Sequence, residues 1–164
     1  MADRKAYTRL QITLHWLIAI LIVAAWLTSD GMGDALEQRI EMGWTGMTGN
    51  QPHNYIGGIV FALILIRIVV RLRVGAPAHL PETSPMMAKA ADWGHKLLYA
   101  LMLIVPALGA ASWYGANEAL GDPHEMAANA LLAVAFGHAL VALYHHYVVK
   151  DQTLLRMTRP SKPK

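Results

Sequence analysis

Eight histidines are the residues of this chain best suited to chemistry, and they stand at positions 15, 53, 79, 95, 124, 138, 145 and 146. His124 and His138 are 14 residues apart, which on an α-helix gives a rise of about 21 Å and a rotation only about 40° short of four full turns. Their imidazoles therefore face the same side of one helix at two depths. Because imidazole is the commonest metal ligand in proteins, this spacing predicts two stacked ligand positions.

The helices that would carry these histidines correspond to four apolar segments, at about residues 10–28, 53–70, 93–112 and 126–149. Each is close to the ~20 residues that cross ~30 Å of hydrocarbon at a rise of about 1.5 Å per residue. The composition agrees, because 55% of the 164 residues are hydrophobic and only 15% are charged. We expect an all-α fold, a transmembrane four-helix bundle in which residues 1–164 form a single membrane domain.

Basic residues flank these segments unevenly: thirteen of the fourteen would lie on one side of the membrane, and only Arg39 on the other. The positive-inside rule makes the basic side the cytoplasm, so both termini are expected to be cytoplasmic. We call this the inner side and the opposite one the outer side. The same distribution argues against a nucleic-acid partner, which the net charge of +3 would otherwise suggest. The inner basic residues are Arg4, Lys5, Arg9, Arg67, Arg71, Arg73, Lys89, Lys96, Lys150, Arg156, Arg159, Lys162 and Lys164.

The chain contains no cysteine. Disulfides, zinc–thiolate sites, iron–sulfur clusters and covalent haem attachment through a C-x-x-C-H motif are therefore excluded. A haem in this protein would be held by coordination and packing alone.

Depth in the membrane selects a partner for each histidine of the last segment. His53 opens the second segment on the outer side, level with His124, whereas His15 and His138 both lie toward the inner side. The spacing thus predicts two haems, each with two axial imidazoles, which leaves no open position for oxygen and favours electron transfer. Pairing His138 with His145 or His146 is a rival arrangement, but seven residues rise only about 10.5 Å, so two haems would collide. A histidine inside a membrane helix can also be a simple packing group.

The remaining histidines lie near the inner ends of the helices. His145 and His146 are either interfacial anchors, together with the neighbouring tyrosines, or part of a quinone or proton site. His79 and His95 are interpreted as interfacial residues, with His95 the better candidate for a functional role.

Arg67 and Arg71 share one face of the second segment because they are four residues apart. That face could neutralise the propionates of the inner haem, although arginines near a helix end also reach toward the interface without any ligand. Gly57 and Gly58 would let a flat macrocycle approach the backbone, but paired glycines equally serve helix packing.

Three motifs resemble the bacterial cytochrome b561 family: YTRLQITLHW at residues 7–16, WGHKLLY at 93–99 and HHYVVKDQTLLRM at 145–157. The resemblance covers most of the chain. It implies a four-helix bundle in the bacterial inner membrane with two non-covalent b haems, His15 with His138 holding the inner one and His53 with His124 the outer one. Some members resemble superoxide oxidases, which pass an electron from periplasmic superoxide through the haems to ubiquinone.

The charge of the outer side bears on that last activity. Against Arg39 it carries seven acidic residues, Asp30, Asp34, Glu37, Glu41, Glu118, Asp122 and Glu125. Such a surface repels a small anion and attracts a basic protein, for example a cationic soluble cytochrome.

Three functions follow as hypotheses. The first is an oxidoreductase that couples a periplasmic donor, with superoxide the most specific candidate, to ubiquinone bound at the inner side near His145, His146 and Arg71. The second is a cytochrome b subunit that anchors a larger dehydrogenase or hydrogenase. The third is a histidine-lined transporter of metal ions or protons, which an absorption spectrum would distinguish because such a transporter is colourless.

Overall fold

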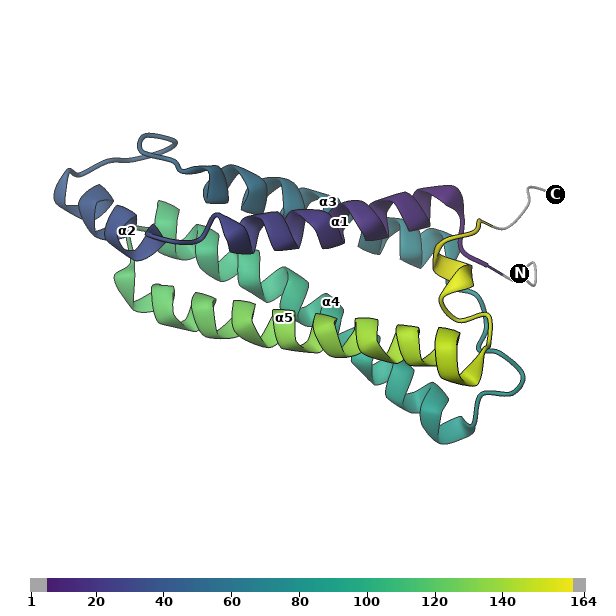
Figure 1. The fold of residues 1–164 in the computed structure, drawn as a ribbon. Helices are drawn as coiled ribbons and strands as arrows, with labels where there is room; N and C mark the ends of the chain where they lie inside the picture. Colours follow the sequence, from purple (N-terminus) through teal and green to yellow (C-terminus); the bar gives the residue numbers. More distant parts are fainter. Residues whose placement is uncertain (1–5, 161–164) are drawn as a thin grey trace.

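The computed structural model describes residues 6–160, and all regular structure in that range is helical. Four long helices are apolar enough to cross a membrane: α1 (Arg9–Leu27), α3 (Pro52–Val74), α4 (Pro85–Tyr114) and α5 (Gly121–Tyr144), the last extended by a short 3-10 turn before it and a π-helical turn after it. A fifth helix, α2 (Met32–Glu41), comes between α1 and α3 in the chain and lies at the end of the bundle opposite the N-terminus (Figure 1). The predicted all-α class with four spans is confirmed.

Local signals set the helix boundaries. Thr8 caps α1 through a capping box with Gln11, and Ser84 caps α4 by accepting a hydrogen bond from the Met87 amide. Pro85 then stands in the first turn of α4, where a missing amide proton costs nothing. Helix α4 therefore begins eight residues before the predicted start at residue 93, because this proline opens the helix.

The outer segment between α1 and α3 is more ordered than its glycine content suggests. Helix α2 was not predicted there. One face of α2 buries Leu36 and Arg39, whereas Asp34, Glu37 and Glu41 point toward solvent. A ten-residue amphipathic helix thus lies over the outer end of the bundle, held by one apolar and one basic side chain.

The long helices pack as two pairs. Helix α1 packs along α3 and α4 along α5, and α3 joins the pairs by packing on α4; within the described residues α5 has no extensive contact with α1 or α3. The apolar core of Ile18, Val60 and Ile64 lies between α1 and α3. Most large apolar side chains are instead exposed on the outside of the helices, as expected where the surrounding solvent is lipid.

The inner end is closed by the segment after α5. Lys150 adopts a left-handed conformation with φ 60°, which turns the chain back so that residues 151–159 run toward α1, as the yellow segment of Figure 1 shows. There the Trp16 indole donates to the Met157 carbonyl at 2.9 Å. The start of α1 and the end of α5 therefore lie at the same end of the bundle. That this end faces the cytoplasm stays a prediction from charge, and four of its basic residues, Arg4, Lys5, Lys162 and Lys164, lie outside the described residues.

Candidate functional site

Two pairs of histidines face one another between the helix pairs. His53 of α3 and His124 of α5 form the outer layer, with ring centroids 6.0 Å apart. His15 of α1 and His138 of α5 form the inner layer, with ring centroids 6.4 Å apart. Both predicted pairs are therefore brought together, and α5 contributes one imidazole to each.

The separation within each layer suits one metal ion with two axial imidazoles. Two collinear metal–nitrogen bonds of about 2.0 Å, with about 1 Å from each nitrogen to its ring centre, give about 6 Å between centroids. No cluster of three or more histidine or acidic side chains within residues 6–160 could hold a metal ion by itself. An iron bound between the imidazoles would therefore need its other positions filled by a macrocycle, which is what haem provides.

Glycines leave room beside both layers. Gly57 lies one turn beyond His53 on the same face of α3, and Gly137 directly precedes His138. A Cβ atom added at either glycine would meet nothing within 4 Å. Helix α5 also makes few contacts with α1 and α3, and both observations agree with a flat group held between the imidazoles.

Main-chain carbonyls orient both rings of the outer layer. His53 Nδ1 donates to the Ala25 carbonyl at 2.8 Å, and His124 Nδ1 donates to the Val105 carbonyl at 2.9 Å. Because a carbonyl only accepts, the ring proton of each histidine sits on Nδ1, which leaves the Nε2 lone pair free to bind a metal. Gly109 of α4 admits the His124 ring, since a Cβ atom there would stand 2.9 Å from the ring carbon Cε1.

The inner layer is surrounded by polar side chains instead. The Arg67 guanidinium donates to His15 Nδ1 at 3.3 Å, to the Tyr99 hydroxyl at 3.2 Å and to the Gln11 carbonyl at 3.0 Å. One turn further inward, Arg71 stacks over the Tyr99 ring at 5.6 Å. In this arrangement His15 Nδ1 accepts a hydrogen bond, so its Nε2 can bind a metal only when Arg67 moves away from Nδ1.

His95 is the member of this layer that sequence reasoning missed. Its ring centroid lies 5.4 Å from that of His138, closer than the ring of His15. With α4 starting at residue 93, His95 would sit at the membrane interface. Because the helix begins at Pro85, His95 instead lies in its third turn, about 15 Å along the axis. The sequence feature that could have predicted this position is the Ser84–Pro85 pair, which starts α4 before residue 93.

The histidines at the end of α5 occupy different environments. His145 donates from Nδ1 to the Asp151 carboxylate at 2.5 Å, and Asp151 also accepts from the Thr153 amide at 2.8 Å. Burial raises the pKa of Asp151, but these hydrogen bonds outweigh it and the pKa is lowered overall. His146 contacts the ring of its neighbour Tyr147.

The structure does not bring all the predicted quinone residues together. Within the described residues, no hydrogen bond or ring contact joins Arg71 to His145 or His146. His145 does lie on the face of α5 that carries His138, because seven residues turn the helix to about 20° short of two full turns. His79 pairs with Asp92 at 3.2 Å on the exposed surface, as an interfacial residue would.

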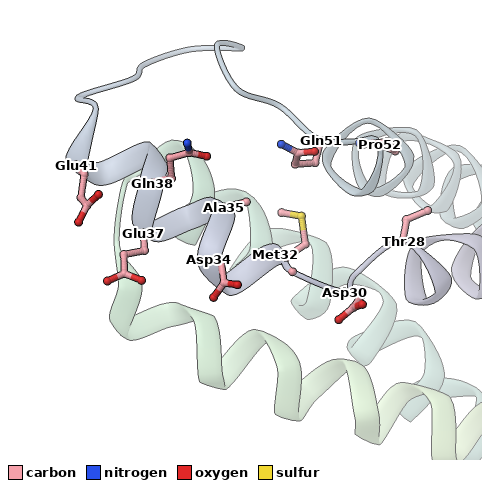
Figure 2. A pocket seen from close by; sticks show the side chains of 11 residues that line it. Thr28, Asp30, Met32, Asp34, Ala35, Glu37, Gln38, Glu41, Gln51 and Pro52 are labelled. Carbon is pink, nitrogen blue, oxygen red and sulfur yellow. The ribbon is translucent and has the colours of Figure 1, made fainter.

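An open acidic cavity of about 860 Å³ lies at the outer end of the bundle. It lies between the outer ends of α1 and α3 and helix α2, and Figure 2 shows the carboxylates of Asp30, Asp34, Glu37 and Glu41 around it. Pro52, the residue before His53, is part of its lining. The outer end of the bundle therefore carries negative charge around this cavity, as the sequence predicted.

Known proteins match this chain over almost its whole length. A family model described as prokaryotic cytochrome b561 matches residues 6–160. Cytochrome b562 from Cereibacter sphaeroides is 42% identical over 98% of this chain and 99% of its own length. A probable superoxide oxidase CybB from Yersinia pestis is 36% identical over 93% of this chain and 96% of its own length. Cytochrome b561 homolog 1 from Escherichia coli K12 is 29% identical over 92% of this chain and 96% of its own length.

Proposed function

The chain belongs to the prokaryotic cytochrome b561 family, and from this premise we propose that it carries electrons across the membrane through two b haems, one held in each histidine layer. Membership makes it a haem-binding membrane electron-transfer protein of bacteria. The observation that supports two sites is the geometry of α5, whose two imidazoles each face a partner 6.0 or 6.4 Å away. The 14-residue spacing sets these layers about 21 Å apart along the helix.

Each surrounding residue then has a role. Haem b, when bound, would supply a one-electron iron couple, and the two histidines of each layer would hold it. The Ala25 and Val105 carbonyls hold His53 and His124 with Nε2 turned away from the hydrogen-bonded side. Arg67 and Arg71 supply positive charge beside the inner layer, where they would pair with carboxylate groups of the bound cofactor.

On the inner side we assign quinone reduction to the region of His145, His146 and Arg71. Each quinone takes two electrons and two protons to become a quinol. Asp151 accepts the proton on His145 Nδ1, so Nε2 of the neutral ring is a hydrogen-bond acceptor that would bind the hydroxyl of the quinol product. Support for this location comes from the shared face of His138 and His145.

On the outer side two kinds of donor have support. Superoxide is suggested by the relative named a probable superoxide oxidase, and its oxidation releases one electron and dioxygen. The acidic cavity favours a basic redox protein instead. Ionic strength separates the two, because salt should speed the reaction with an anion by screening repulsion and slow that with a basic protein.

Haem stoichiometry tests the central proposal. We expect two haems per purified chain, and only one in both His124→Ala and His138→Ala, because each change removes one of two axial bonds. Visible spectra of the reduced proteins and pyridine haemochrome assays give the counts. A colourless wild-type protein, or unchanged haem content in both variants, would rule the proposal out.

A further inference from the structure

Arg39 is the most deeply buried charged side chain of the described structure. It is 1% exposed. Its Nε donates to the Trp113 carbonyl at 2.9 Å and its Nη2 to the Gly46 carbonyl at 3.0 Å, while Nη1 donates to the Thr48 carbonyl. The guanidinium carbon also lies 5.0 Å from the centre of the Trp113 ring. None of these partners is acidic, so the hydrogen bonds are satisfied but the charge is not neutralised.

The contacts of Arg39 join three segments into one unit. Helix α2 provides the arginine, the loop 42–51 provides two carbonyls, and the outer end of α4 provides the third carbonyl and the indole. The Trp113 indole in turn donates to the Asn50 side chain at 2.7 Å, and Asn50 donates to the Tyr114 hydroxyl at 3.0 Å. We call residues 32–51 the outer cap.

Glycines shape the loop that surrounds the guanidinium. Gly46 has φ +58°, a conformation that side chains with a Cβ rarely adopt. Gly49 packs against the Trp44 ring so closely that a Cβ atom would overlap it at 2.2 Å. The loop is therefore built to bring carbonyl oxygens to this arginine.

The guanidinium lies just beyond the outer layer. Trp113 is one helical turn, or about 6 Å, from Gly109, and the His124 ring rests against Gly109. From the other side, Asn50 is three residues before His53. The acidic side chains of α2 face water, where their fields are screened, whereas Arg39 is shielded from solvent.

We propose that Arg39 positions the outer cap over the outer layer and that its unneutralised charge raises the midpoint potential of the outer haem. The physical reason is Coulombic: an electron arriving at the outer layer is attracted by a fixed positive charge across a poorly screening interior. If Arg39 had only a structural role, it would hold the outer cap without affecting the midpoint potential. The inference rests on the proposed function, because it requires a haem in the outer layer.

Potentiometric titration of the purified holoprotein, followed by visible absorption, tests this. Single-haem variants at His124 and His138 assign the two midpoints. Arg39→Gln should shift the outer midpoint to lower potential and leave the inner one in place. Arg39→Lys keeps the charge, so its outer midpoint should stay closer to that of the wild type even if the cap is looser. Arg73→Gln removes an equal charge from the exposed inner end of α3 and should leave the outer midpoint unchanged.

The outcomes separate this inference from the proposed function. A wild-type protein without two titrating haems would overturn both. Alternatively, the wild type shows two haems while Arg39→Gln shifts both midpoints equally or shifts neither. That result would overturn the inference alone. If Arg39→Gln fails to fold, an outer midpoint in Arg39→Lys that falls well below the wild-type value would also contradict it.

Discussion

The two histidine layers are held by different kinds of group. In the outer layer, main-chain carbonyls fix both imidazoles, and the nearby arginine is saturated by further carbonyls. In the inner layer, the side chains of Arg67, Tyr99 and His95 surround the imidazoles. A helix carbonyl cannot turn, whereas a guanidinium can exchange one acceptor for another. The outer layer is thus pre-organised, and the inner layer can rearrange when a ligand arrives.

The largest expected effect comes from filling the space that the outer layer needs. Gly109→Val would place side-chain atoms where the His124 ring lies, since even a Cβ atom would approach it to 2.9 Å. Overpacking of this kind costs about 1–3 kcal/mol, and a pre-organised ring has no alternative position. We expect loss of the outer haem with the inner haem retained, measured by haem content and redox titration.

A matched control lies on the same helix. At Gly94 an added Cβ atom would meet nothing within 4 Å, so Gly94→Val should keep both haems. If Gly109→Val also keeps both, the outer layer is less rigid than its carbonyl contacts indicate.

An intermediate effect is expected from Arg67. Arg67→Met removes the positive charge that would pair with a carboxylate of the inner haem. Because a hydrogen bond to a charged group contributes about 1.5–3 kcal/mol, haem binding should weaken about 10–100-fold. Haem dissociation to an acceptor protein would report the change, which should be confined to the inner haem. Arg71→Met, whose described contact is the Tyr99 ring, serves for comparison and should weaken binding less. Equal loss of both haems would show that the two layers are not independent.

The smallest effect is expected from the hydrogen bonds of Asp151, which follows α5 at the inner end of the bundle. The lowered pKa of Asp151 means that its hydrogen bonds stabilise the fold above the ordinary carboxyl pKa, and that this contribution is lost as the pH falls through the lowered value. Asp151→Asn should therefore reduce the free energy of unfolding by about 1 kcal/mol at neutral pH, and the difference should vanish in acid. Thermal unfolding against pH measures this.

Asp92→Asn is the control for Asp151. Its partner His79 lies on the surface, and the Asp92 side chain is 54% exposed, so this change should have little effect at any pH. A comparable loss of stability in both variants would contradict the distinction.

Much of the site could be predicted from the sequence because membrane helices are regular. The spacing of His124 and His138 predicted their common face, and hydropathy placed His53 level with His124 and His15 level with His138. The approach of His95 was missed because it depends on where α4 begins. The pairing of His145 with Asp151 depends on a π-helical turn and a left-handed Lys150, and neither has a reliable sequence signal. Helix α2 and the burial of Arg39 depend on contacts with α4 that lie far away in sequence.

The position of α5 has a consequence for biogenesis. Helix α5 leaves the ribosome after α1, α3 and α4, yet it would supply one iron ligand to each layer. Neither haem could gain its second axial bond until α5 has been synthesised and inserted. A nascent chain that stalls or is cleaved before α5 would therefore be unable to retain the cofactor, so haem loading would distinguish molecules that contain α5 from molecules that lack it.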